Sequence, residues 1–142
     1  FRAYDMNEVA RYYTASEDVA EFLAHYPERH DFREEAGGNR VFINVWCWEP
    51  AWKIRVTENG RELPVRREQT EDPLYVISYD IPQSVWKGKY PVDYGKRGKQ
   101  HTLFTVDASG PATTLEIEVT DSFGKVYRET MVRPKAFGPQ MK

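Results

Sequence analysis

Histidine and cysteine are the residues of this chain that we test first for metal chemistry. The three histidines, His25, His30 and His101, show neither His-x-His nor His-Glu-x-x-His spacing, and a single cysteine cannot build a structural zinc site. We therefore expect no metal ligand. Because Cys47 falls within an apolar run and has no partner for an internal disulfide, we expect a small buried hydrophobic side chain and not a reactive thiol.

Motifs for phosphate binding and for nucleophilic catalysis are weak. The run Gly95–Lys99 is Gly-Lys-Arg-Gly-Lys, but it lacks Walker spacing and does not join a strand to a helix, so we expect a solvated basic loop with at most a weak attraction for anions. There is no Gly-x-Ser-x-Gly elbow, and Ser122 suits a turn. Glu116 and Glu118 would share the wet face of a strand. We expect no catalytic residue here. The basic residues of the loop region are Lys87, Lys89, Lys96, Arg97 and Lys99.

The tryptophans are the strongest candidates for a binding surface. Flat aromatic side chains can stack on a sugar ring, but they also pack in cores and between sheets, and their exposure decides between the two roles. Both interpretations remain open for Trp46, which would share a strand face with Trp48. The candidate residues of a ligand-binding or interdomain surface are Trp48, Trp52, Trp86 and His101.

Length and composition exclude several classes of protein. A chain of 142 residues is most simply one domain, and an aromatic content of 14% favours strands and large buried side chains. A formal charge of −2 implies no basic face for nucleic acid. No apolar run approaches the ~20 residues that a membrane-spanning helix needs.

Alternation of apolar and polar side chains predicts a mainly β protein. The clearest pair of strands is 113–120 and 125–132, joined by the corner Asp121–Gly124. Seven short strands at this spacing favour an antiparallel β-sandwich of the immunoglobulin or fibronectin type III kind. The other five predicted strands are 40–48, 52–57, 61–67, 74–80 and 101–107.

Local signals refine this arrangement. The strand 40–48 is apolar on both faces, which predicts a central strand covered on two sides. Asn59-Gly60 predicts a tight hairpin, and Pro64 places the return strand at an edge. Residues 83–99 are expected to form a long irregular connection. In the corner, we expect Phe123 to fold back over the sandwich end and Gly124 to supply a positive φ.

Residues 1–39 are expected to form a helical and linker segment packed on a β-sandwich domain of residues 40–142. Apolar residues at helical spacing predict a helix over 16–26, started by Thr14 or Ser16 and ended by Pro27. A second short helix could start at Asp5, and residues 28–39 read as a loop. The residues predicted to lie in the core are Ile43, Val45, Ile54, Val56, Leu103, Val106, Leu115, Ile117, Val119 and Val126.

Two short motifs of this chain are distinctive in combination, the Asn-Val-Trp of 44–46 and the Thr-Asp-Ser-Phe-Gly of 120–124. With these motifs, the chain resembles the C-terminal domain of calcineurin-like metallophosphoesterases of the Bacteroidota. The opening Arg2–Val9 is similar to the segment that joins this domain to the catalytic one. The resemblance covers nearly the whole chain. The remaining similar segments are 47–56, 58–60, 72–74, 101–104, 125–127 and 133–137.

The resemblance implies a parent hydrolase with an N-terminal β-domain, a central phosphoesterase domain that holds two divalent metal ions, and this module. The metal-binding motifs of that family are Asp-x-His, Gly-Asp, Gly-Asn-His and Gly-His-x-His, and none of them occurs in this sequence. Gly38-Asn39 is not the third motif, because it is followed by Arg40. No catalytic, cofactor-binding or metal-binding residue is therefore carried over. The family also suggests a periplasmic or cell-envelope location. Because the chain starts at Phe1, without an initiator Met or signal peptide, we expect a piece of a longer protein or a processed product.

Three hypotheses for function follow. The leading one is an accessory, non-catalytic β-sandwich that packs on or caps the upstream phosphoesterase domain, which would be its partner. The alternative is an independent module that binds carbohydrate or the cell envelope through Trp48, Trp52 or Trp86. The third is a hydrolase with an unrecognised site, which would require a pocket that gathers His101 with carboxylates.

Overall fold

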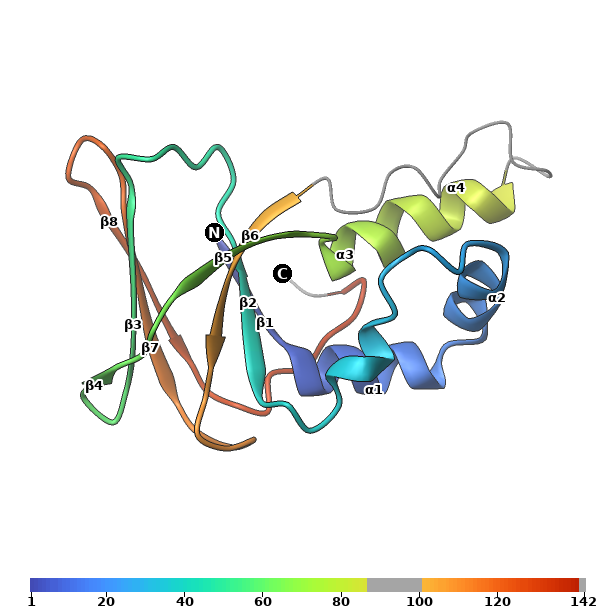
Figure 1. Cartoon of the computed structure of the whole chain (residues 1–142), viewed down its shortest axis with the longest axis horizontal. Helices are drawn as coiled ribbons and strands as arrows, with labels where there is room; N and C mark the ends of the chain where they lie inside the picture. The colour runs from blue at the N-terminus through green and yellow to red at the C-terminus, as the bar shows by residue number, and fades with distance from the viewer. Residues whose placement is uncertain (87–100, 141–142) are drawn as a thin grey trace.

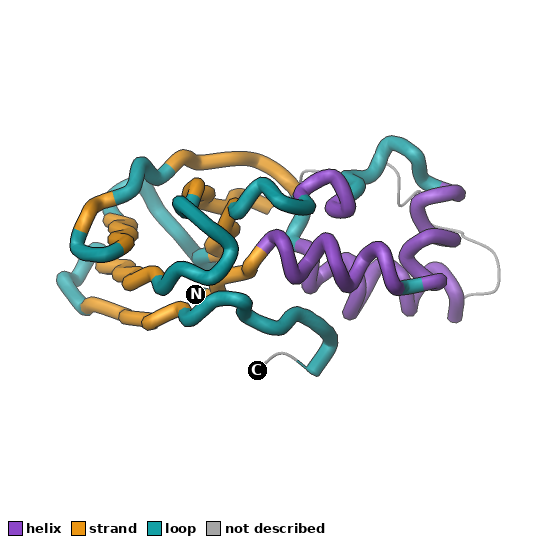
Figure 2. The backbone as a smooth tube through the Cα atoms, turned by 90° about the horizontal axis from the view of Figure 1, so that it is seen from below, coloured by secondary structure: helices purple, strands orange, loops and turns teal. Residues whose placement is uncertain are grey.

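The protein is a mainly β sandwich with helices on one side. The computed structural model describes residues 1–86 and 101–140. Two antiparallel four-stranded sheets pack face to face, and the helices cover the outer face of the first sheet (Figure 1). Figure 2 shows the same division from below, with the strands gathered at one end of the molecule and the helices at the other. The predicted fold class is confirmed.

The strand order of the two sheets follows the immunoglobulin pattern. With the strands lettered in chain order and the two-residue β4 set apart as C′, the sheets read A-B-E-D and C′-C-F-G. The first sheet has the order β1 (Arg2–Asp5), β2 (Arg40–Asn44), β6 (His101–Asp107) and β5 (Arg66–Thr70). The second has the order β4 (Arg61–Glu62), β3 (Lys53–Glu58), β7 (Leu115–Thr120) and β8 (Val126–Met131).

Two helical insertions, one between β1 and β2 and one after β5, form the third layer. Two helices of the first insertion are the predicted ones, with Asp5 and Ser16 as N-caps: the Asp5 carboxylate accepts a hydrogen bond from the Asn7 amide at 3.3 Å, and the Ser16 hydroxyl accepts one from the Val19 amide at 3.3 Å. The first insertion holds α1 (Met6–Ala15), α2 (Glu17–His25) and the 3₁₀ helix η1 (Phe32–Glu35). The second holds α3 (Pro73–Tyr75), the π-helix η2 (Val76–Asp80) and α4 (Ile81–Trp86).

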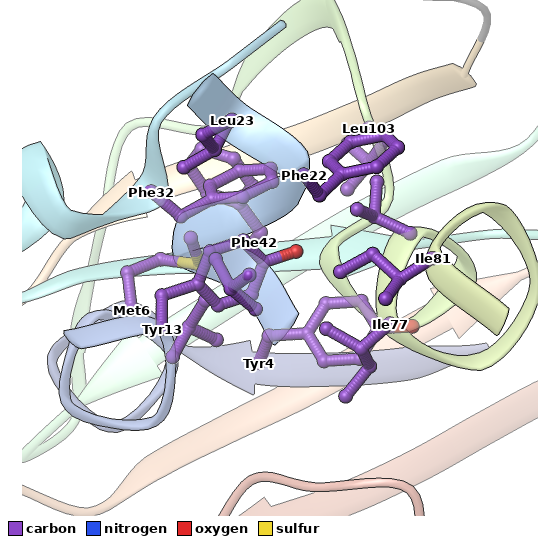
Figure 3. Packing of buried hydrophobic residues seen from close by; sticks show 13 residues of the cluster. Tyr4, Met6, Tyr13, Phe22, Leu23, Phe32, Phe42, Ile77, Ile81 and Leu103 are labelled. Atoms are coloured by element: carbon purple, nitrogen blue, oxygen red, sulfur yellow. The ribbon is translucent and has the colours of Figure 1, made fainter. Parts of the chain in front are cut away.

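Strand β2 belongs to two hydrophobic cores, as its two apolar faces predict. Val41 and Ile43 lie in the core between the sheets. Phe42 points the other way, into the core between the first sheet and the helices, where it packs with side chains such as Phe32 and Leu103 (Figure 3). Eight of the ten predicted core residues are buried, and Ile54 and Val126 are half-buried.

One predicted strand is wrong: residues 74–80 are helical. Asp72 is an N-cap whose carboxylate accepts hydrogen bonds from the amides of Leu74 at 2.8 Å and Tyr75 at 3.1 Å, and Pro73 occupies the first turn. Val76, Ile77 and Asp80 are buried together, which is helical spacing. Residues 83–86, expected to be irregular, complete α4, and residues 87–100 lie outside the described part.

The strand predicted over 40–48 ends at Asn44, and its last four residues turn. The Trp48 amide donates to the Val45 carbonyl at 3.3 Å, and Cys47 adopts a positive φ of 58°. Trp46 and Trp48 therefore do not share a strand face. The Cys47 side chain is exposed, and the expectation that it is buried is wrong.

The hairpin at Asn59-Gly60 is confirmed, with positive φ at both residues and the pair Glu58↔Arg61 beside it. The return strand, predicted over 61–67, divides at Pro64. Residues 61–62 pair with β3, and residues 66–70 cross to the edge of the other sheet as β5. This division follows from proline, which has no amide hydrogen to donate to a ladder.

Two further elements were not predicted. Residues 2–5 form an edge strand of the first sheet, with Arg2 paired to Asn44 and Asp5 paired to Val41. The segment 28–39, read as a loop, contains η1 and buries Phe32 completely.

Buried ion pairs tie the helical layer to the strands. The Arg29 guanidinium contacts the carboxylates of Glu71 at 2.7 Å and Asp80 at 2.6 Å. After β8, Arg133 reaches back to Asp5 at 3.1 Å, and both side chains are fully buried. The segment that follows β8 thus fastens the start of α1 to the sandwich.

Candidate functional site

An open groove of about 670 Å³ lies where the first sheet meets the second helical insertion. Arg2 and Asn44 are neighbours on β1 and β2, Trp46 comes from the turn that follows β2, and Tyr75 comes from α3. Ligand-binding pockets commonly have volumes of roughly 300–1,000 Å³. The described residues that line the groove are Arg2, Tyr4, Asn44, Val45, Trp46, Cys47, Trp48, Asp72, Leu74, Tyr75, Ser78 and Thr102.

Asp72 organises the base of this groove. One carboxylate oxygen accepts the two α3 amides described above. The other accepts hydrogen bonds from the Tyr4 hydroxyl at 3.0 Å and from the Asn44 side-chain amide. Because four protein groups donate hydrogen bonds to it, this buried carboxylate has its hydrogen-bonding needs met within the protein. Its negative charge stabilises the fold and is not available to bind a ligand.

Tyr4 remains protonated at neutral pH. Burial, the charge of Asp72 and the hydrogen bond to Asp72 raise the pKa of Tyr4 well above its ordinary value, and the nearby Arg2 opposes the rise. The phenol therefore acts as a fixed hydrogen-bond donor to Asp72 and not as a general base.

Among the described residues, the walls of the groove are aromatic and carry one positive charge, that of Arg2. The Trp46 side chain is 52% exposed and Tyr75 is 36% exposed, both large values for hydrophobic side chains. The Arg2 guanidinium lies 5.7 Å from the centroid of the Trp46 ring, within cation–π range. Arg2 has no carboxylate partner in the described part of the chain.

A broader group of aromatic side chains gathers at the same end of the sandwich. Trp52 immediately precedes β3, and the pair Lys53↔Thr120 places it beside the Asp121–Gly124 corner. We call Trp46, Trp48, Trp52 and Phe123 the aromatic end.

Phe123 protrudes from this end and is 95% exposed, so the prediction that it folds back is wrong. The Asp121 carboxylate accepts hydrogen bonds from the amides of both Phe123 and Lys125 at 2.9 Å, and Gly124 supplies the expected positive φ of 84°. This tight turn directs the Phe123 side chain away from the sheets.

Two of the four predicted site residues, Trp48 and Trp52, have side chains that the structure describes. Trp48 and Trp52 lie at the aromatic end, half-buried against the inter-sheet core. Trp48 packs edge-on to Phe104 at 5.3 Å and lies under the Arg67 guanidinium, so most of its surface serves packing. The backbone of His101 starts β6 at this same end, and Trp86 ends α4; the side chains of both lie outside the described part, as do the basic residues from Lys87 to Lys99.

The described residues do not suit a metal ion. None of them form a group of three or more His, Cys, Asp or Glu side chains that could hold one. His25 lies near the end of α2, with a ring nitrogen 3.0 Å from the Glu21 carbonyl, and His30 stacks on Phe32. We therefore derive no metal-dependent step from the described residues. Within residues 1–86 and 101–140, no helix has the length and apolar character needed to cross a bilayer.

Sequence reasoning missed Arg2, Asp72 and Tyr75. The groove depends on the unpredicted strand β1 and on the helix misread as a strand. Asp72-Pro73 was the available signal, because Asp at an N-cap followed by Pro in the first turn is typical of a helix start. No local signal indicates that Arg2 would lie beside Trp46, which is a long-range contact.

Comparison with known proteins places the chain in a family. A search of curated proteins and a search of solved structures each returned no match. A family model described as the C terminal of calcineurin-like phosphoesterase matches residues 3–127, which is most of the chain. This protein therefore belongs to the family of C-terminal domains of calcineurin-like phosphoesterases.

Proposed function

We propose that this chain is an accessory, non-catalytic domain that packs on the phosphoesterase domain preceding it in the same polypeptide. The family match carries this proposal, because a C-terminal domain of a phosphoesterase implies a catalytic domain upstream. The two divalent metal ions of the reaction would be held by that upstream domain.

The aromatic end is the surface that best suits this packing. Phe123 is almost fully exposed on a turn fixed by Asp121, and Trp52 is half-buried beside that turn. A rigid exposed phenylalanine adds nothing to the core of its own domain, whereas aromatic side chains are enriched in protein interfaces.

The position of β1 supports the same surface. Phe1 packs against the inter-sheet core, and Arg2 pairs with Asn44 at the end of β2, next to the turn that carries Trp46. In Figure 1, the label N marks the start of the chain beside the upper part of β2. A preceding domain would therefore be joined to this chain at the aromatic end, within reach of Trp52 and Phe123.

Substitutions at the aromatic end of the full-length phosphoesterase test this proposal. We expect Phe123→Ser and Trp52→Ala to separate the two domains, which small-angle X-ray scattering would record as a larger radius of gyration. Hydrogen exchange of residues 45–52 and 121–124 should become faster at the same time.

Val132→Ser is the matched control. Val132 is 65% exposed but follows β8, at the opposite end of the sandwich from Phe123, so its replacement should leave both measurements unchanged. If Phe123→Ser and Trp52→Ala behave like Val132→Ser, the aromatic end does not bind the catalytic domain. Persistent metal-dependent hydrolysis by the 142-residue chain alone would show instead that the chain is not merely accessory.

A further inference from the structure

We propose that the groove between β1, the Trp46 turn and α3 binds an organic anion with a flat ring, such as a phosphate monoester of an aromatic compound or nucleoside. The proposal goes beyond the packing described above, because the residues that line the groove all come from this chain. The groove shares Trp46 and Trp48 with the aromatic end, so a catalytic domain packed there would border it.

The charges of the groove select an anion. Arg2 and Asp72 are the only Arg, Lys, Asp or Glu side chains among the described residues that line it. The Asp72 carboxylate already accepts four hydrogen bonds, from Tyr4, Asn44 and the first turn of α3. Among the described residues, Arg2 is therefore the charge that remains for a ligand, and a guanidinium recognises phosphate or carboxylate with paired hydrogen bonds.

The aromatic walls select a flat ring. Trp46 and Tyr75 come from different elements. Trp46 is 52% exposed, and Tyr75, which packs on Tyr79 with ring centroids 5.0 Å apart, keeps 36% of its surface exposed. Because the Arg2 guanidinium lies over the Trp46 ring, a ligand whose ring is close to its anionic group would contact both side chains at once.

A neutral carbohydrate fits these residues less well. Sugar hydroxyls need acceptors as well as donors, and the Asp72 carboxylate in the groove is occupied by protein donors.

The groove also borders the π-helix η2, which contributes Ser78, and short π-helical turns occur frequently at functional sites.

Adenosine 5′-monophosphate is a suitable probe, with adenosine and inorganic phosphate as its two halves. We expect isothermal titration of the 142-residue chain to show binding of the monophosphate at least ~10-fold tighter than binding of either half, since stacking and a charged hydrogen bond each contribute about one factor of ten or more. Amide chemical-shift changes should map to β1, residues 44–48 and α3.

Two substitutions and two matched controls locate the site. Arg2→Gln and Trp46→Ala should each weaken binding of the monophosphate by ~10-fold or more. Arg128→Gln and Tyr127→Ala, at exposed side chains of β8 that do not line the groove, should not change it.

Four results would overturn the proposal. They are equal binding of adenosine and its monophosphate, binding that is indifferent to Arg2→Gln, no binding of the monophosphate at all, and binding of methyl glucoside that depends on Trp46. The last would establish a carbohydrate site instead. Since the titration uses this chain alone, its failure would leave the proposed packing on the catalytic domain untouched.

Discussion

At the scale of single residues, Asp5 joins more parts of the molecule than its type suggests. Its carboxylate N-caps α1 through the Asn7 amide, contacts the Arg133 guanidinium, and accepts a hydrogen bond from the Lys135 amide at 3.2 Å. Because Asp5 and Arg133 are both fully buried, removal of either partner leaves a charge without its counterion in the interior.

We predict that Arg133→Met destabilises the protein by about 3–5 kcal/mol, because it leaves the Asp5 carboxylate buried and uncompensated. The double variant Asp5→Asn/Arg133→Met should be more stable than Arg133→Met, since asparagine retains an N-cap and carries no charge. Urea unfolding measures both. Arg128→Ala, which breaks the exposed pair with Glu118, is the control and should cost at most about 1 kcal/mol. A double variant no more stable than the single one would show that the charge is not the cause.

The Glu58 carboxylate should make the free energy of unfolding depend on pH. Burial raises the pKa of Glu58, but hydrogen bonds from Thr113 and Ser109 and the charge of Arg133 lower it, and the net effect is a pKa below the ordinary value. Both carboxylate oxygens accept the Ser109 amide, at 3.1 and 3.2 Å. The stability that this carboxylate contributes is therefore complete above the ordinary pKa of glutamate, about 4.3, and is lost as the pH falls through the lowered value.

We expect Glu58→Gln to be less stable than the wild-type protein at neutral pH, with a difference that shrinks as the pH falls below about 4.3. Urea unfolding at a series of pH values between neutral and acid provides the measurement. Glu62→Gln, which breaks the exposed ion pair with Arg55 at 2.9 Å, is the control and should differ from the wild-type protein by at most about 1 kcal/mol at every pH. A constant difference between Glu58→Gln and wild type at every pH would rule out this linkage.

At the scale of elements, apolar periodicity was enough to predict the strands with clear alternation, but it was not enough to predict the helix over 73–86, which only its cap signals. The segment from Leu74 to Asp80 has apolar residues at both strand and helix spacing, so its periodicity alone does not decide. The cap formed by Asp72 and the buried positions Val76, Ile77 and Asp80 decide for a helix. Strand β1 is only four residues long and ends at Asp5, the N-cap of α1, so it is too short to show a clear alternation.

The candidate site was predictable only in part, because it is built from three separate segments. Trp48 and Trp52 could be chosen by residue type, and both lie at the aromatic end. The groove itself needs β1 beside β2 and α3 above them, and neither element was predicted. Trp46 was predicted to share a face of the strand 40–48 with Trp48, whereas the structure places it in the turn after Asn44. Long-range pairing of this kind has no signature in a single local window.

At the scale of the whole molecule, the helical layer and the sandwich share the first sheet and should therefore unfold together. Phe42 and Ile43 are consecutive residues of β2 that lie in the two different cores, and both are fully buried. The segment after β8 adds a second link, because Phe137 packs against Tyr4 and Tyr13 of the helix-side core. Loss of the helices would expose the Phe42 face of the sheet, and loss of the second sheet would expose the Ile43 face.

We therefore predict a single cooperative unit, which native-state hydrogen exchange can measure. The amides of Tyr13 in α1 and Ile117 in β7 should open with the same free energy. Phe42→Ala, in the helix-side core, should lower both values equally by about 3–5 kcal/mol, and Ile117→Ala, in the inter-sheet core, should lower both equally by about 2–5 kcal/mol. If each substitution lowers only the amides of its own layer, the two layers unfold separately and β2 does not couple them. Equal losses would mean that the amides of both layers exchange through the same global unfolding, so that a substitution in one core weakens the other layer by the same amount.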